Sequence, residues 1–277
     1  MTPMTRVAVV TGAARGIGAA TVRGLAAAGW AVVAVDRGVD DPRIPYAMAS
    51  ADELHAVVES ALALAPPPVA PGGPDAGQVV AQVADATDPE ALAAAVATAE
   101  DRFGGLDAMI SLAGVIAGGV PLWEMPADQV DAVLSVDLGG PITAARVGVP
   151  ALLRRAVPRE GRYLAVSSAA ATRGLPMLSA YGAAKAGVAG LVRGLAVELA
   201  GTGVTANAIS PGSTATAMLR ESARLYGLDD TGPFADQQPI GRLLTPEEVA
   251  GTLVWLAGTE SAPITGAVIP VDGGLSL

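Results

Sequence analysis

The sequence contains no cysteine and a single histidine among its 277 residues. Without cysteine there can be no disulfide framework, no thiolate nucleophile and no cysteine-ligated metal. The one histidine, His55, cannot build a histidine-rich zinc site or a relay of two histidines. We therefore expect no metal centre, and any chemistry must use hydroxyl groups, carboxylates, lysine, arginine or a bound cofactor.

Basic residues are also scarce: the chain has 17 lysines and arginines and 27 aspartates and glutamates. The formal net charge is therefore −10. This charge repels phosphate backbones and anionic membranes unless a local basic patch intervenes, and the sequence shows no such cluster. No stretch approaches the roughly 20 uncharged apolar residues that span a bilayer, and residues 1–11 lack the regions of a signal peptide. The sequence predicts a cytoplasmic protein with no nucleic-acid partner and no membrane partner.

Aromatic residues make up 3% of a chain that is 51% apolar and has 34 glycines, so we expect a core of small aliphatic side chains. Short apolar runs alternate with longer helical patterns rich in alanine and leucine, which favours strands joined by helices. The predicted strands are 6–11, 31–36, 79–84, 106–112, 162–167, 204–209 and 267–271. We predict one α/β domain over 1–277, a Rossmann-type doubly wound parallel seven-stranded sheet with helices on both faces.

The connection between the second and third predicted strands is too long for an ordinary crossover, which needs about a dozen residues or somewhat more. We therefore expect an insert at about 38–77. Ser50 and Glu53 form a capping box that opens a helix to about Ala65, and a linker rich in proline and glycine follows over 66–74. His55 lies on this helix and is expected to be a surface or packing residue. A surface loop of no consequence is the simplest interpretation of the insert.

A glycine-rich turn follows the first predicted strand and opens a helix. Glycines at such a turn let backbone N–H groups approach a pyrophosphate, and the helix N-terminus adds positive potential. The turn carries Gly12, Arg15, Gly16, Ile17 and Gly18. The context predicts a dinucleotide site.

Asp36 ends the second predicted strand, where its carboxylate can accept from both ribose hydroxyls and would repel a 2′-phosphate. This favours NAD. Arg15 and Arg37 stand where a 2′-phosphate could be held, so NADP remains the alternative. Asp85 ends the third predicted strand and could accept from the adenine amino group.

Tyr181 and Lys185 are four residues apart at the start of a long apolar helix, so they share one face. A neighbouring ammonium lowers the pKa of a phenol and makes it a usable base. Ser168 ends the strand just before this helix and could hold a substrate oxygen. The spacing of these three residues downstream of a nucleotide site predicts an enzyme.

At this point the sequence resembles the short-chain dehydrogenase/reductase family over nearly the whole chain outside the insert. The resemblance implies a catalytic set of Ser168, Tyr181 and Lys185, of which the last two also meet the cofactor. It adds Pro211 and Gly212 to the cofactor site and implies that Thr214 and Thr216 meet the nicotinamide carboxamide. It also extends that site to Ala86, Ala113 and Gly114. The closing segment 271–274 is similar to the family's C-terminal signature.

Three positions depart from the family pattern. Ser111 and Leu112 replace two asparagines, and Asp137 occupies the position of an asparagine that supports a water relay to the lysine. An amide both donates and accepts, whereas an ionised carboxylate only accepts. Asp137 is therefore a catalytic candidate that could rewire the relay or partly neutralise Lys185. These departures also motivate the alternative function, a catalytically weak NAD-binding sensor or scaffold.

The insert, with the segment 118–123, resembles the mycofactocin-associated branch of the family, which implies tightly bound NAD and a peptide-derived redox carrier as partner. The leading hypothesis is an NAD-dependent oxidoreductase acting on an alcohol or a ketone or aldehyde. In this hypothesis the insert covers the adenosine half of the cofactor. The segment 217–239 is expected to form an apolar substrate pocket with Met218, Leu219, Leu225, Tyr226 and Phe234. Long helices over 128–156 and 179–200 are expected to bury apolar faces in a homotetramer or homodimer.

Overall fold

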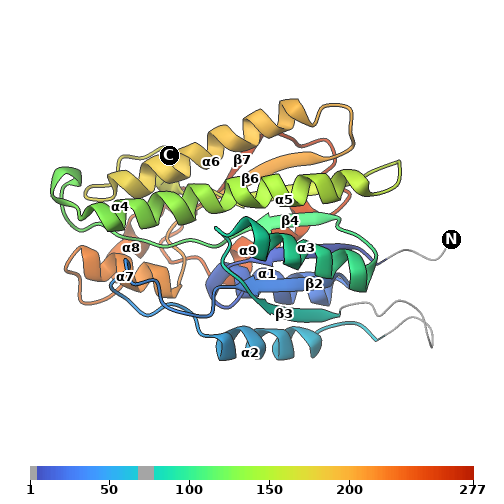
Figure 1. The fold of residues 1–277 in the computed structure, drawn as a ribbon. Helices are drawn as coiled ribbons and strands as arrows, with labels where there is room; N and C mark the ends of the chain where they lie inside the picture. Colours follow the sequence, from blue (N-terminus) through green and yellow to red (C-terminus); the bar gives the residue numbers. More distant parts are fainter. Residues whose placement is uncertain (1–4, 68–77) are drawn as a thin grey trace.

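A computed structural model describes residues 5–67 and 78–277 (Figure 1). Seven strands form one sheet in the order β3-β2-β1-β4-β5-β6-β7, and every neighbouring pair is parallel. The strands are β1 Val7–Thr11, β2 Ala31–Asp36, β3 Val79–Val83, β4 Ala108–Ser111, β5 Arg162–Val166, β6 Thr205–Pro211 and β7 Val268–Val271. The predicted fold class is confirmed.

The inner strands are buried on both sides, which explains their continuous runs of valine and alanine. All five residues of β1 and the first five of β2 are buried. The strand order reverses between β1 and β4, and ligands of open parallel sheets bind at such a switch point, beyond the carboxyl ends of the strands. The fold therefore places a binding site next to the glycine-rich turn that follows β1.

Helices cover both faces of the sheet (Figure 1). The three helices α3, α5 and α6 pack on one face through side chains such as Leu92, Leu152 and Val188. The three helices α1, α2 and α9 pack on the other face. Their bounds are α1 Gly16–Ala27, α2 Ala51–Leu62, α3 Pro89–Phe103, α5 Gly140–Arg154, α6 Ser179–Glu198 and α9 Pro246–Ala257. Two shorter helices after β6, α7 Ala217–Leu225 and α8 Gly232–Asp236, lie together at one end of the molecule.

Helix α2 corrects the interpretation of the insert. Its predicted capping box is present, because Ser50 Oγ accepts from the Glu53 amide and the Glu53 carboxylate accepts from the Ser50 amide. Its buried face, with Leu54 and Val57, packs in the core beside α1 and β2. The capped helix is therefore the ordinary crossover helix between β2 and β3. The extra length lies in the segment 37–50 before it and in the connection after it, whose residues 68–77 fall outside the described residues.

The long helix predicted over 128–156 is present as one continuous helical run over 127–154. It consists of α4 Ala127–Leu134, a π-helical turn Ser135–Gly139 and then α5. By length and composition, the run 127–154 is the one helical stretch among the described residues that could cross a membrane, but half of its most apolar window is buried inside the protein. This is the pattern of a core helix. The π-helical turn is the feature that matters for the site, because it carries Asp137.

Candidate active site

A cavity of about 650 Å³ opens at the carboxyl ends of the strands. Every predicted cofactor residue lines it, as do Ser168, Tyr181 and Lys185, whereas Asp137 does not. The cofactor residues concerned are Gly12, Arg15, Gly16, Ile17, Gly18, Asp36, Arg37, Asp85, Ala86, Ala113, Gly114, Tyr181, Lys185, Pro211, Gly212, Thr214 and Thr216. The fold thus brings residues from six strand ends into one site.

The glycine-rich turn leaves the start of α1 free to bind an anion. Gly12 and Gly16 have positive φ angles of 69° and 54°. A Cβ on Gly12 would lie 2.6 Å from the Ala113 amide nitrogen, and one on Gly18 would collide with the Gly12 carbonyl, so neither position tolerates a side chain. The N-cap of α1 makes no side-chain hydrogen bond, and its first turn has no acidic residue. These free N–H groups fit a pyrophosphate.

Asp36 lies at the end of β2 and is half-buried. Its Oδ2 accepts a hydrogen bond of 3.0 Å from the Ala14 amide. Burial raises the pKa of Asp36, while the Ala14 and Gly38 amides and the Arg15 charge act in the opposite direction. An acceptor held in this way fits a ribose with two free hydroxyls.

The two arginines that could favour NADP are engaged by carboxylates. Arg15 donates from Nε and Nη2 to the two oxygens of Glu53, both at 2.6 Å, and holds the pKa of Glu53 at about 2. Arg37 lies 2.7 Å from Asp41 and 3.5 Å from Asp85. Because both guanidinium charges are offset, the site fits NAD better than NADP.

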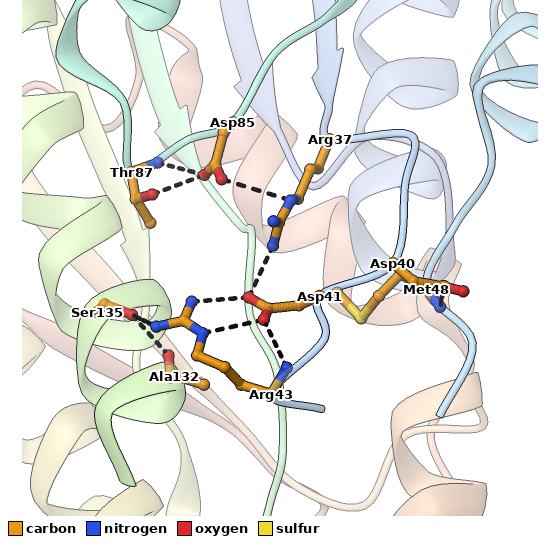
Figure 2. A network of polar contacts seen from close by, with 9 residues as sticks. All are labelled: Arg37, Asp40, Asp41, Arg43, Met48, Asp85, Thr87, Ala132 and Ser135. Carbon is orange, nitrogen blue, oxygen red and sulfur yellow. Dashed lines mark hydrogen bonds and ion pairs between the residues drawn. The ribbon is translucent and has the colours of Figure 1, made fainter. Parts of the chain in front are cut away.

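Figure 2 shows how the segment 37–50 is fastened beside this end of the cavity. The Asp41 carboxylate is 1% exposed and accepts from both Arg37 and Arg43. Hydrogen bonding from Arg43 holds the pKa of Asp41 well below its usual range. Arg43 also donates to the Ser135 hydroxyl over 3.3 Å, which ties the segment to the π-helical turn.

Ser168, Tyr181 and Lys185 meet where β5 ends and α6 begins. Ser168 Oγ accepts from the Ala170 amide at 3.1 Å and hydrogen-bonds Tyr181. Lys185 Nζ lies 5.6 Å from the centroid of the Tyr181 ring and donates to the Val166 carbonyl at 3.3 Å. Burial raises the pKa of Tyr181, and the Lys185 charge and the Ser168 hydrogen bond oppose that rise.

Asp137 acts on this group through Lys185. Its Oδ1 lies 2.9 Å from Lys185 Nζ, and its side chain is completely buried. Burial disfavours the Lys185 ammonium, but Asp137 and Tyr181 outweigh it and raise the pKa of Lys185. A Cβ on Gly114 would lie 2.7 Å from the same carboxylate oxygen, so this position needs glycine. Asp137 therefore holds Lys185 in place and keeps its ammonium protonated, although Asp137 itself does not line the cavity.

Beyond these groups the lining is mostly apolar, with Glu221, Ser222 and Gln237 as polar exceptions. Met218, Leu219, Tyr226 and Phe234 line it, as expected for the segment 217–239. Leu225 is not among the lining residues; it packs in the apolar cluster next to the cavity.

Among the lining residues that sequence reasoning missed, four come from the segment 37–50. They are Tyr46, Ala47, Met48 and Ala49. The Tyr46 hydroxyl accepts a 2.9 Å hydrogen bond from the Ile116 amide, which fixes the ring. An aromatic residue inside an overlong crossover, in a chain with nine aromatic residues, was the available signal.

Comparison with known proteins identifies the family. The short chain dehydrogenase model matches residues 6–65, and the enoyl-(acyl carrier protein) reductase model matches residues 68–276. NovJ, a short-chain reductase protein of Streptomyces niveus, is 39% identical over 97% of this chain and 93% of its own length. The cis-4-hydroxycyclohexanecarboxylate dehydrogenase of Sinomonas cyclohexanicum is 38% identical over 97% and 96%.

Among solved structures, carveol dehydrogenase from Mycobacterium avium in complex with NAD has a TM-score of 0.88 at 28% identity and covers 98% of both chains. That complex contains NAD, the cofactor that the Asp36 geometry favours here. The chain belongs to the short-chain dehydrogenase/reductase family.

Proposed function

We propose that the protein is an NAD-dependent oxidoreductase that interconverts an alcohol with a ketone or an aldehyde. The observation that carries this proposal is the single cavity shared by two sets of groups. Ser168, Tyr181 and Lys185 line it together with the glycine-rich turn and Asp36. A group that moves a proton and a site that fits a dinucleotide are thereby placed in reach of one substrate.

The chemistry of each lining residue indicates which part of the cofactor it would bind. The N–H groups at the start of α1 bind the pyrophosphate, and Asp36 accepts from the adenosine ribose. Lys185 holds the nicotinamide ribose, and Thr214 and Thr216 meet the carboxamide, as the family resemblance implies. Bound NAD supplies the hydride acceptor for oxidation and, once reduced, the hydride donor for reduction.

The chain itself moves the proton. In the oxidative direction the Tyr181 phenolate oxygen takes the hydroxyl proton of the alcohol, and the Ser168 hydroxyl orients the same substrate oxygen. Lys185 stabilises the phenolate by its positive charge, since an opposite charge nearby favours the ionised form of a phenol. In the reductive direction Tyr181 returns the proton to the carbonyl oxygen.

We further propose that NAD stays tightly bound and is re-oxidised in place by an external carrier of the mycofactocin type. The segment 37–50 supports this, because polar contacts fasten it to its surroundings beside the cavity. Arg37 pairs with Asp85, Arg43 donates to the Ser135 hydroxyl, and the Ala47 carbonyl accepts from Arg15. The capped helix, by contrast, belongs to the sheet packing and does not line the cavity. We therefore propose that the segment 37–50, and not the capped helix, covers the adenosine half of the cofactor.

A Tyr181→Phe variant tests the reaction. General acid–base groups contribute roughly 10²–10⁴-fold to rate, so turnover should fall by that factor while NAD affinity stays close to that of the unmodified protein. The measurement is alcohol-dependent reduction of bound NAD, followed by nicotinamide absorbance, with an artificial electron acceptor for repeated turnover. Activity within threefold of the unmodified protein would refute Tyr181 as the base. NAD binding with no alcohol-dependent reduction in the unmodified protein would favour a sensor or scaffold.

A further inference from the structure

The charge of the cavity is unevenly distributed among its described lining residues. The charged residues that line it are Arg15, Asp36, Arg37, Asp85, Lys185 and Glu221. The first four belong to the dinucleotide end, where carboxylates engage both arginines. Lys185 is paired with Asp137. This leaves Glu221 as the charged side chain of the substrate end.

Glu221 lines the cavity, whereas its ion-pair partner Arg224 does not. It lies on α7, and its side chain is 23% exposed. Arg224, one turn further along the helix, donates to Glu221 Oε2 at 2.8 Å but is 54% exposed and does not line the cavity. An anion entering the site would therefore meet the glutamate before its counter-charge.

The other described residues at this end include two aromatic rings and two methionines, beside the polar Ser222 and Gln237. Tyr226 and Phe234 lie with ring centroids 6.2 Å apart and tilted by 57°. The Tyr226 hydroxyl donates to the Pro176 carbonyl at 2.8 Å, and the Tyr46 hydroxyl accepts from the Ile116 amide. The backbone holds both hydroxyls and fixes the two rings as walls of the cavity, while the Tyr46 hydroxyl keeps its own proton as a donor. Met48 and Met218 complete an apolar surface.

We propose that the substrate is a neutral, apolar alcohol or ketone, and that Glu221 excludes substrates that carry a carboxylate. The proposal rests on the proposed function and narrows its substrate class. A substrate carboxylate at this end of the cavity would lose its hydration and be repelled by the negative charge of Glu221. No cation among the described residues lines this end to compensate for these two costs. Acidic relatives of an accepted ketone should therefore bind weakly.

Binding to the NADH-loaded protein tests the proposal directly, with nicotinamide fluorescence as the readout. Three ketones differ in one substituent: 4-methylcyclohexanone, 4-oxocyclohexanecarboxamide and 4-oxocyclohexanecarboxylate. The amide has the shape of the carboxylate without its charge. We expect the carboxylate to bind at least about tenfold more weakly than the amide, and the methyl compound to bind best.

Two variants assign the effect to Glu221. Glu221→Gln should reduce the difference in affinity between amide and carboxylate to within about threefold. Glu221→Lys should make the carboxylate bind more tightly than the amide. Glu247→Gln is the matched control, because Glu247 also pairs with an arginine, Arg23, but does not line the cavity. It should leave the gap unchanged.

Equal binding of amide and carboxylate, a gap that persists in Glu221→Gln, or no binding of 4-methylcyclohexanone would each overturn the proposal. Failure of the proposed function looks different. In that case the neutral ketones bind, and the carboxylate gap responds to Glu221, but no NADH is consumed when a bound ketone is present.

Discussion

The positive charge of Lys185 interacts with two groups, the Tyr181 phenol and the Asp137 carboxylate. Its ammonium is needed beside Tyr181 to favour the phenolate, yet its nearest charged neighbour is the buried Asp137 carboxylate at 2.9 Å. Burial is the main cause of the raised pKa of Tyr181, and the negative charge of Asp137 adds to it. The same carboxylate keeps Lys185 protonated inside the protein. Asp137 thus secures the cation while weakening its effect on the phenol.

An Asp137→Asn variant should move the pH–rate profile for alcohol oxidation toward lower pH. Oxidation needs the phenolate, and removal of a negative charge that raises the pKa of Tyr181 makes that phenolate available at lower pH. The measurement is kcat against pH with saturating alcohol. Asp131→Asn is the control, since Asp131 is exposed on α4, and its profile should match that of the unmodified protein. An unchanged or alkaline-shifted profile in Asp137→Asn would contradict this account.

Cofactor choice is also set by single residues. Asp36 should keep NADP affinity far below NAD affinity, because a 2′-phosphate would approach a half-buried carboxylate while Arg15 and Arg37 are already paired. Asp36→Ala should reduce the ratio of NAD affinity to NADP affinity by roughly tenfold or more, as expected when a like-charge contact is removed. Calorimetric titration of both nucleotides measures it. A preference of the unmodified protein for NADP would show that the arginines dominate.

At the scale of elements, the segment 37–50 depends on one buried carboxylate. Asp41 joins Arg37 from the end of β2 to Arg43, which reaches the π-helical turn through Ser135 (Figure 2). Because Arg43 holds the pKa of Asp41 below its usual range, this pairing stabilises the segment above the ordinary aspartate pKa of about 3.9. The stabilisation is lost only as the pH falls through the depressed pKa, so it is fully present at neutral pH.

An Arg43→Ala variant should release bound NAD faster by several-fold to roughly tenfold, since affinity differences arise mainly in the off-rate. Exchange of bound NAD for a fluorescent analogue gives the rate. Arg102→Ala removes an exposed arginine from α3, away from the cavity, and serves as the control. If both variants exchange NAD at the rate of the unmodified protein, the segment does not retain the cofactor.

The elements show how far the sequence predicts this structure. All seven strands were predicted, because buried parallel strands read as continuous apolar runs between glycine-rich or polar turns. The capping box correctly located the start of α2. Its role was misread, because crossover length alone cannot say which part of a long connection packs on the sheet. Leu54 and Val57 decide this only through their contacts in the core.

The site divides in the same way. Residues at strand ends were predictable, because parallel strands bring their carboxyl ends to one edge. Tyr46 was not, since its place in the cavity depends on the path of an irregular segment fixed by Asp41 and Arg43. Glu221 was missed for a related reason: its segment, 217–239, was expected at the substrate pocket, but which of its side chains line the cavity depends on how the segment folds and packs.

For the whole molecule, one surface of the chain has the composition of an interface. The outward positions of α6 include Ala183, Ala186, Gly190 and Val197, and the last of these is 78% exposed. On the neighbouring α5, Ile142 is also exposed. Small and apolar side chains let two helical faces approach closely, as symmetric dimers do. We therefore keep the proposal of a homodimer or homotetramer and place the contact on α5 and α6.

Val197→Glu tests that placement. A carboxylate buried in the contact loses its hydration without gaining a partner, so the dimer should dissociate at a protein concentration at least about tenfold higher than before. Light scattering across a dilution series measures this with NAD bound. Leu64→Glu is the control, because Leu64 is likewise exposed but follows α2, on the face of the sheet opposite α5 and α6 (Figure 1). It should assemble as the unmodified protein does. A monomeric unmodified protein, or assembly equally weakened by both variants, would remove α5 and α6 as the interface.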